Sequence, residues 1–392
     1  MTAPPASGTN SGVISFARGI PSPDLFPVRE LAEASRRAFA SHSDTALNYG
    51  PPAGFRPLAG QLGDRHGVAP DRIVITPGSY ILLTLLVRVL AGSGPVLVET
   101  PAYDRANGLL REAGARVIPI PHNGDGIDLA ALERYLAAGE ESPAFLYVMP
   151  TVHNPTGTTM PPPGRERLAD LAVRHGLLLV EDDPYGQLRF GGEPAASLHS
   201  LLEARGAGHL ALFASSFSKT VAPGLRVGYG VLPGYLAGPV TRAALEEYVS
   251  PPMWPQAVVH EFLAAGFLPA HLARVRAMLR ERYDALAGGL EAGLPGQARW
   301  PAPDGGYFLW LELPGGLRSD DLLAACEQAG VTFAPGSGFF CHGGGEHRAR
   351  LCFSSPPLAD IRAGADRLTA AARRLLNTPT AAATTRGGRD DR

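Results

Sequence analysis

The chain has 392 residues, of which 45% are hydrophobic and 18% are charged, and its formal net charge is -2. These values are typical of a folded globular protein and exclude an intrinsically disordered chain. The balanced charge also argues against a dedicated nucleic-acid binder, which needs a basic face. Of the 35 basic residues, 34 are arginines, and Lys219 is the only lysine.

The two ends of the chain are low in complexity, and we expect residues 1–12 and 377–392 to be disordered. The first segment lacks the basic and apolar regions of a signal peptide. The longest apolar stretch, residues 80–91, is too short to span a bilayer and contains Arg88. The spacing of the three cysteines is not that of a metal site. We therefore expect a cytoplasmic protein with no metal, membrane or nucleic-acid partner.

Short apolar runs alternate with helical patterns, such as residues 164–176, over the first two thirds of the chain. This alternation predicts an α/β fold with a mainly parallel seven-stranded sheet sandwiched by helices. Ligands of such sheets bind at the carboxyl ends of the strands. The expected strands are residues 72–76, 95–99, 115–120, 144–149, 176–182, 210–215 and 226–232.

The pattern changes after about residue 256. One long helical stretch, residues 261–293, is followed by two strand-like runs, 305–313 and 349–355. This order predicts a smaller α+β domain. The expected division is a large ligand-binding domain (49–255), a small C-terminal domain (256–376) and an N-terminal segment (13–48) that joins the small domain and covers the substrate.

Polar side chains follow several of the expected strands. Gly78 and Ser79 lie in a tight turn before a helix, where free backbone N–H groups suit a phosphate, although most such turns are only turns. Tyr103 follows the next strand and either stacks on a planar ligand or belongs to the core. Asn154 follows another strand, as a hydrogen-bond donor or as an ordinary turn residue before proline.

Three acidic residues, Glu181, Asp182 and Asp183, end a strongly apolar strand. A carboxylate buried at that position needs a partner, because burial penalises an isolated charge. Tyr185 follows three residues after Asp182. This end of the sheet is therefore a candidate site for a cationic group.

The single lysine ends another strand, among Ser215, Ser216 and Ser218, with Arg226 seven residues beyond it. Arginine stays protonated and is no nucleophile, whereas a desolvated lysine loses its proton and attacks a carbonyl to form a Schiff base. A lysine that survived by chance would most often lie on a solvated helix face. We therefore predict a functional role for Lys219.

Five sequence motifs follow one another along the chain: "YGPPAGFRPL", "PGSYILL", "HNPTG", "VEDDPY" and "SSFSKTVAPGLRVGY". This set resembles the fold-type I pyridoxal-phosphate enzymes, and within them the class I aminotransferases of the 2-aminoadipate and aromatic branch, related to the catalytic domain of MocR-type regulators. The resemblance covers roughly residues 13 to 375. It implies pyridoxal 5'-phosphate as cofactor, an amino acid and a 2-oxo acid as substrates, and an aspartate-aminotransferase-like large domain in a homodimer.

The resemblance also implies a catalytic set of Lys219, Asp182 and Tyr185. Lys219 would hold the cofactor as a Schiff base and shuttle the substrate α-proton. Asp182 would pair with the pyridinium nitrogen and keep it protonated. Tyr185 and Asn154 would hydrogen-bond the ring hydroxyl oxygen, and Tyr103 would stack on the ring.

The remaining implied roles concern the phosphate and the substrate. Tyr49 would reach the phosphate of the neighbouring subunit, which makes the homodimer part of the site. Arg350 would clamp the substrate α-carboxylate in a bidentate pair, with Asn154 also among the substrate-binding residues. The phosphate would be surrounded by Gly78, Ser79, Tyr80, Ser216, Ser218 and Arg226.

Three positions depart from the pattern of that branch. Arg18 stands where a small residue is usual in a segment over the substrate, and it either recognises a second carboxylate or another anion or simply faces solvent. Tyr80 and His153 stand at places often held by glutamine. These differences do not affect the residues expected to hold the cofactor, but they leave the identity of the substrate undetermined.

Three hypotheses follow for the activity. The first is an aminotransferase, and the second is a pyridoxal-phosphate enzyme of the same fold that catalyses β- or γ-elimination and replacement, racemisation or carbon–carbon bond formation. Lys219, Asp182 and Arg350 do not separate these two, because both need the same first steps. The third, a transcriptional regulator, would need a DNA-binding domain for which the dozen residues before residue 13 are too few.

Overall fold

The computed structural model describes residues 12–90, 92–139, 141–192 and 195–378. Most of the two ends that were expected to be disordered, residues 1–11 and 379–392, lie outside the described residues. The C-terminal helix reaches Asn377, so the structured part extends one residue past the expected boundary at 376.

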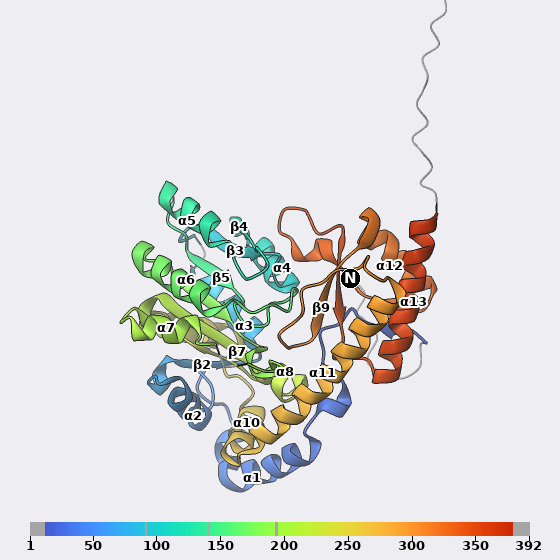
Figure 1. Ribbon diagram of the computed structural model, residues 1–392. Helices are drawn as coiled ribbons and strands as arrows, with labels where there is room; N and C mark the ends of the chain where they lie inside the picture. Colours follow the sequence, from blue (N-terminus) through green and yellow to red (C-terminus); the bar gives the residue numbers. More distant parts are fainter. Residues whose placement is uncertain (1–11, 91, 140, 193–194, 379–392) are drawn as a thin grey trace, which may run out of the picture.

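A seven-stranded sheet forms the larger part of the molecule (Figure 1). Its strands lie in the order β2-β8-β7-β6-β5-β3-β4, and all are parallel except β8, which is antiparallel to both of its neighbours. The predicted α/β fold with a mainly parallel sheet is therefore confirmed. The strands are β2 (Ile73–Thr76), β3 (Val96–Thr100), β4 (Val117–Pro121), β5 (Phe145–Val148), β6 (Leu179–Asp182), β7 (Ala211–Ser216) and β8 (Gly228–Val231).

Helices cover both faces of this sheet because successive strand residues point to opposite sides. On β5, Phe145 and Tyr147 belong to the core shared with α3, whereas Leu146 and Val148 belong to the core shared with α6 and α7. The helices of this part are α1 (Val28–Ala46), α2 (Arg56–His66), α3 (Ser79–Leu90), α4 (Asp104–Glu112), α5 (Leu129–Ala138), α6 (Pro162–His175), α7 (Leu198–Ala204), α8 (Phe217–Thr220), α9 (Gly234–Tyr248) and α10 (Met253–Ala264).

The long helical stretch expected at residues 261–293 is two helices, α10 and α11 (Phe267–Gly293). Gly266 between them has φ +71°, a left-handed conformation that suits glycine and ends α10. The two helices meet at a bend of 90°. Among the described residues, no single helix is long and apolar enough to cross a membrane. Only α10 and α11 taken together, across this bend, have the required length and apolar composition. The boundary expected at residue 256 lies inside α10, which packs against α1 and α2, so the division into domains stays a prediction.

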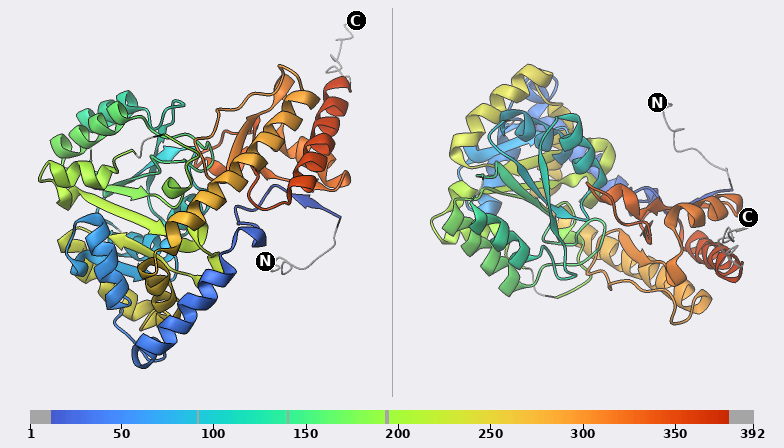
Figure 2. Two further views of the ribbon diagram at one scale, coloured as in Figure 1. Left: turned by 60° about the horizontal axis from the view of Figure 1, so that its bottom comes forward. Right: turned by 90° about the horizontal axis from the view of Figure 1, so that it is seen from above.

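The second part of the molecule is built on a three-stranded antiparallel sheet in the order β11-β12-β9. Near the N-terminus β1 (Ile14–Ser15) pairs with β10 (Val331–Thr332), so the start of the chain returns to this C-terminal part. The helix α11 runs from α10 to α13 and links the two parts (Figures 1 and 2). The other elements are β9 (Phe308–Glu312), β11 (Ala334–Pro335), β12 (Arg348–Cys352), α12 (Ser319–Gln328) and α13 (Leu358–Asn377).

Candidate active site

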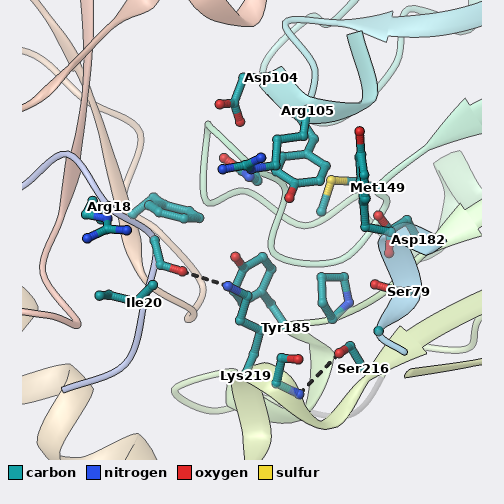
Figure 3. A pocket seen from close by; sticks show the side chains of 18 of the residues that line it. Arg18, Ile20, Ser79, Asp104, Arg105, Met149, Asp182, Tyr185, Ser216 and Lys219 are labelled. Carbon is teal, nitrogen blue, oxygen red and sulfur yellow. Dashed lines mark hydrogen bonds between the residues drawn. The ribbon is translucent and has the colours of Figure 1, made fainter. Parts of the chain in front are cut away.

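A cavity of about 340 Å³ opens at the carboxyl ends of the central strands, where residues at or after the ends of β2, β3, β5, β6 and β7 meet β9, β12 and the segment after β1 (Figure 3). This is the edge at which ligands of parallel sheets bind. All predicted site residues except Tyr49 line the cavity. They are Arg18, Gly78, Ser79, Tyr80, Tyr103, Asn154, Asp182, Tyr185, Ser216, Ser218, Lys219, Arg226 and Arg350.

Lys219 lies on the one-turn helix α8, which follows directly on β7. The Ser216 side chain caps this turn by accepting a hydrogen bond from the backbone N–H of Ser218 at 3.1 Å. The Lys219 amine donates to the backbone oxygen of Gly19 at 2.6 Å, and the Tyr307 hydroxyl donates to the backbone oxygen of Lys219 at 2.7 Å. Both the side chain and the backbone of the lysine are thus held inside the cavity.

The electrostatic surroundings favour the neutral form of the lysine. Burial lowers the pKa of the Lys219 ammonium to about 8, and the nearby guanidinium groups of Arg350, Arg226 and Arg105 act in the same direction. An amine with this pKa is partly neutral near pH 7, which a nucleophile requires. Arginine in the same place would stay protonated.

Asp182 ends β6 with one of its two carboxylate oxygens unpaired. The Tyr147 hydroxyl donates to Oδ2 at 2.7 Å, while Oδ1 is buried and has no hydrogen-bond partner among the described residues. Burial raises the pKa of the Asp182 carboxyl to about 6, although the hydrogen bond from Tyr147 opposes this shift. A buried acceptor of this kind is costly unless a donor meets it, so it fits the protonated ring nitrogen of a pyridoxal cofactor.

Two glycines, Gly78 and Gly228, allow neighbouring segments to approach closely at the turn before α3. Gly78 has φ +92°, and a Cβ there would overlap the Arg226 guanidinium. A Cβ on Gly228 of β8 would overlap the backbone nitrogen of Ser79, the first residue of α3. The two glycines therefore leave room at a helix N-terminus whose free N–H groups suit a phosphate.

Arg226 supplies a cation beside that helix N-terminus. Its Nη2 donates to the backbone oxygen of Pro77 at 2.9 Å, and its Nη1 donates to the Ser218 hydroxyl at 3.3 Å. Ser216 and Tyr80 complete this wall of the cavity. The set of hydroxyls, backbone N–H groups and one guanidinium fits a phosphate dianion.

Arg350 lies on β12 and enters the cavity from the smaller sheet. Its Nη1 donates to Asn154 Oδ1 at 3.0 Å and its Nη2 to the backbone oxygen of Ala17 at 2.9 Å. The guanidinium carbon lies 4.3 Å from the ring centroid of Phe308 and 4.7 Å from that of Phe339. Its Nε is buried and has no hydrogen-bond partner among the described residues. A guanidinium held in this way, with an unmet donor, fits a carboxylate.

Tyr185 and Tyr103 are the aromatic residues of the predicted set. Tyr185 is buried, with its ring centroid 5.3 Å from Tyr307 and 5.7 Å from Phe308, both edge-on. Burial raises the pKa of its hydroxyl well above the ordinary value, so the group stays protonated and can donate a hydrogen bond. Tyr103 is half-buried and precedes α4. Their contacts with a cofactor ring stay predictions.

Two residues singled out in the sequence lie elsewhere. Tyr49 is 84% exposed and does not line the cavity of its own chain. His153 is buried behind the cavity wall, where its Nδ1 lies 2.9 Å from the Thr156 hydroxyl and its Nε2 lies 3.7 Å from Glu99. It therefore does not touch the cavity, whereas its neighbour Asn154 does.

The sequence reasoning missed several residues of the site. Tyr147 stands inside an apolar strand run, so nothing in the pattern distinguished it from a core residue. Tyr307 and Phe308 lie at the start of a strand assigned to the other part of the molecule, far along the chain from Lys219. Arg105 follows Tyr103 by two residues, and nothing in the sequence pattern distinguished it from the other arginines of the chain.

The comparisons with known proteins agree with this geometry. The family model for aminotransferase class I and II matches residues 11–368. The chain is 39% identical over 367 residues to a 2-aminoadipate transaminase of Thermus thermophilus, covering 93% of this chain and 91% of that protein. It is 31% identical over 368 residues to aromatic-amino-acid aminotransferase 1 of Thermococcus litoralis, covering 91% and 87% of the two chains.

A solved structure leads to the same family and to the cofactor. The α-aminoadipate aminotransferase LysN of Thermus thermophilus, complexed with N-(5'-phosphopyridoxyl)-L-leucine, superimposes with a TM-score of 0.88 at 37% identity, covering 93% of both chains. The chain therefore belongs to the aminotransferase class I and II family and is a pyridoxal-phosphate-dependent transferase.

Proposed function

We propose that this protein moves an amino group between an L-amino acid and a 2-oxo acid, with Lys219 as the residue that binds the cofactor and carries the substrate α-proton. The observation that supports these roles is the convergence of the Lys219 amine, the unpaired oxygen of Asp182 and the guanidinium of Arg350 in one cavity. The family match favours transamination over the elimination, replacement and carbon–carbon bond-forming reactions that the sequence alone left open.

The cavity offers each part of the cofactor a matching group. Pyridoxal phosphate, when bound, supplies an aldehyde that condenses with amines and a ring that withdraws electrons from the substrate Cα. Asp182 Oδ1 would accept the ring N–H and keep that nitrogen protonated. The hydroxyl of Tyr185 would donate to the ring oxygen. The phosphate would be held by Gly78, Ser79, Tyr80, Ser216, Ser218 and Arg226.

Two residues act on the substrate itself. Arg350 would bind the α-carboxylate through its guanidinium, which fixes the orientation of the Cα–H bond and contributes to the rate by positioning. The neutral amine of Lys219 would then remove the α-proton of the substrate and return a proton at a later step of the amino transfer. Tyr307 holds the backbone of Lys219 and so limits the movement of that amine to its side chain.

We propose that the protein is a homodimer with shared active sites. Tyr49 is 84% exposed, and its neighbour Leu47 and the nearby Val249 are exposed at 68% and 57%. The Gly50 N–H donates to the Ser250 hydroxyl at 2.9 Å, which brings these apolar side chains to one surface. Contact with a second copy would bury them and carry Tyr49 to the partner's phosphate site. We also propose a cytoplasmic location.

The test of the function is a half-reaction with the amino donor alone. Holoenzyme mixed with an amino acid and no oxo acid is expected to convert about one equivalent of cofactor to its aminated form and release one equivalent of 2-oxo acid. Absorption spectroscopy and quantification of the oxo acid measure this stoichiometry. Release of a side-chain leaving group with the cofactor unchanged would instead show an elimination enzyme.

The lowered pKa of Lys219 predicts how attachment of the cofactor depends on pH. With a pKa of about 8, about one amine in ten is neutral at pH 7 and about nine in ten at pH 9. The rate at which apoprotein binds pyridoxal phosphate covalently is therefore expected to rise about tenfold between these pH values, as followed by absorbance in stopped flow. A rate that keeps rising steeply toward pH 10.5 would show an unperturbed lysine. Lys219→Ala, which lacks the amine, is the control.

A further inference from the structure

Side chains of the kinds that bind metal ions gather outside the active site, where α1 and α2 pack against α10 (Figure 1). His42 comes from α1, and His260 and Glu261 come from α10. A ring nitrogen of each histidine and one oxygen of Glu261 all lie within 4.8 Å of one another. None of these three residues lines the cavity that contains Lys219. The group is therefore separate from the candidate active site.

The sequence pattern did not indicate this group, because His42 lies 219 residues before Glu261. The expectation of no metal was based on the spacing of the three cysteines. Within the part of the chain that the structure describes, these side chains are the only three histidines, cysteines or acids that gather so closely. The packing of α1 on α10 brings them together.

The spacing of the ligand atoms suits a tetrahedral ion. His42 Nε2 lies 3.0 Å from Glu261 Oε1. Two ligands of a tetrahedral zinc ion lie about 3.3 Å apart, because zinc bonds to nitrogen and oxygen are about 2.0 to 2.1 Å long. Without a metal, a proton on His42 Nε2 joins the two groups. A metal ion can take the place of that proton, because metals bind the deprotonated form of each ligand.

Both imidazole rings are held in place by their neighbours. Their centroids lie 5.2 Å (His42) and 5.9 Å (His260) from that of Phe55, both edge-on. Phe55 is buried, and its backbone N–H donates to the side-chain oxygen of Gln256 of α10 at 2.8 Å. His260 Nδ1 donates to the side-chain oxygen of Gln61 at 3.2 Å, which leaves the lone pair of Nε2 free. Metal-bound histidines commonly have such an oxygen partner on the other ring nitrogen.

The group is accessible to an ion and also partly shielded from water. The side chains of His42 and Glu261 are 21% and 14% exposed. Burial lowers the pKa of His260 more than the neighbouring Glu261 carboxylate raises it. The His260 ring is therefore neutral near pH 7, and the neutral imidazole is the form that binds metals.

We propose that His42, His260 and Glu261 form a zinc site that ties the C-terminal half of α1 to α10, with water as the fourth ligand. Zn²⁺ takes imidazole and carboxylate ligands together, whereas Mg²⁺ and Ca²⁺ prefer oxygen ligands alone. Because α1 ends at Ala46, the ion would also fix the segment that leads to Tyr49 and the proposed dimer contact. This inference does not depend on the proposed amino-transfer function.

The test is isothermal titration with ZnCl₂ of holoenzyme that has been dialysed against a chelator. The wild type is expected to bind about one equivalent of Zn²⁺ per chain and no Mg²⁺. His42→Gln, His260→Gln and Glu261→Gln each remove one ligand and are each expected to weaken zinc binding by more than about 100-fold. Gln61→Leu removes only the oxygen partner of His260 and is expected to weaken it about tenfold.

The matched control is His175→Gln, an exposed histidine at the end of α6, which is expected to leave zinc affinity unchanged. Circular dichroism checks that each variant folds. The same zinc affinity in the wild type and in all three ligand variants would overturn the proposal. So would a wild-type holoenzyme that binds no Zn²⁺.

X-ray absorption at the zinc edge gives a readout that depends on no variant. Zinc-loaded holoenzyme is expected to show imidazole and oxygen ligands at about 2.0 to 2.1 Å, and a sulfur ligand at about 2.3 Å would place the ion at a cysteine and overturn the site. Zinc at about 100 times its Kd is also expected to raise the Tm of the wild type by at least about 2 °C, and that of Glu261→Gln several times less. Equal shifts would contradict the link between α1 and α10.

Discussion

Replacing Lys219 with arginine is expected to abolish turnover, lowering kcat by at least about 10³-fold. The substitution keeps a cation in the cavity, and the bond from Tyr307 reaches the backbone oxygen of residue 219 and so survives the change. The fold is therefore expected to be retained. What is lost is an amine that can become neutral at ordinary pH, because a guanidinium stays protonated. The chain contains no second lysine to replace it.

The measurement combines steady-state kinetics with chemical labelling. Borohydride treatment of wild-type holoenzyme, followed by peptide mapping, is expected to place the reduced cofactor on the peptide that contains Lys219 and on no other. Lys219→Arg is expected to carry no label while giving a circular dichroism spectrum like that of the wild type. Activity near the wild-type level in this variant would contradict the assigned role.

Asp182→Asn is expected to lower kcat by about 10²- to 10³-fold, as loss of one preorganised electrostatic group does in other active sites. Asparagine has nearly the same shape, and its amide oxygen can still accept the hydrogen bond from the Tyr147 hydroxyl. The charge that keeps the ring nitrogen protonated disappears, so the ring withdraws electrons less strongly. The rate of the half-reaction with amino donor measures this effect directly.

Tyr147→Phe is the companion variant for that experiment. It removes the hydrogen bond at 2.7 Å to Asp182 but keeps the carboxylate and its unpaired oxygen. The bond also lowers the pKa of the Asp182 carboxyl, so its loss is expected to raise that pKa above about 6. The expected loss in kcat is at most about tenfold and larger at acid pH. Equal rates for Asp182→Asn and wild type would show that Asp182 is not the charge partner of the ring nitrogen.

Periodicity and turn chemistry predicted much of the fold correctly. All seven strands of the large sheet lie within one or two residues of their expected ends, except the start of β6, because alternation of short apolar runs with helices is encoded locally. The single helix expected at 261–293 was wrong, because its apolar pattern continues across Gly266. Only the packing of α10 on α1 and α2, and of α11 on α13, shows where the chain bends.

The sequence by itself identified Lys219, Asp182 and Arg226 as candidates, because a lone lysine, a buried acid and a motif order are all local features of the chain. The tertiary structure alone decided what surrounds them. Tyr147 reaches Asp182 from the neighbouring strand, and Arg350 reaches Asn154 from a different sheet. Such contacts depend on how distant elements pack, and no spacing along the chain specifies them.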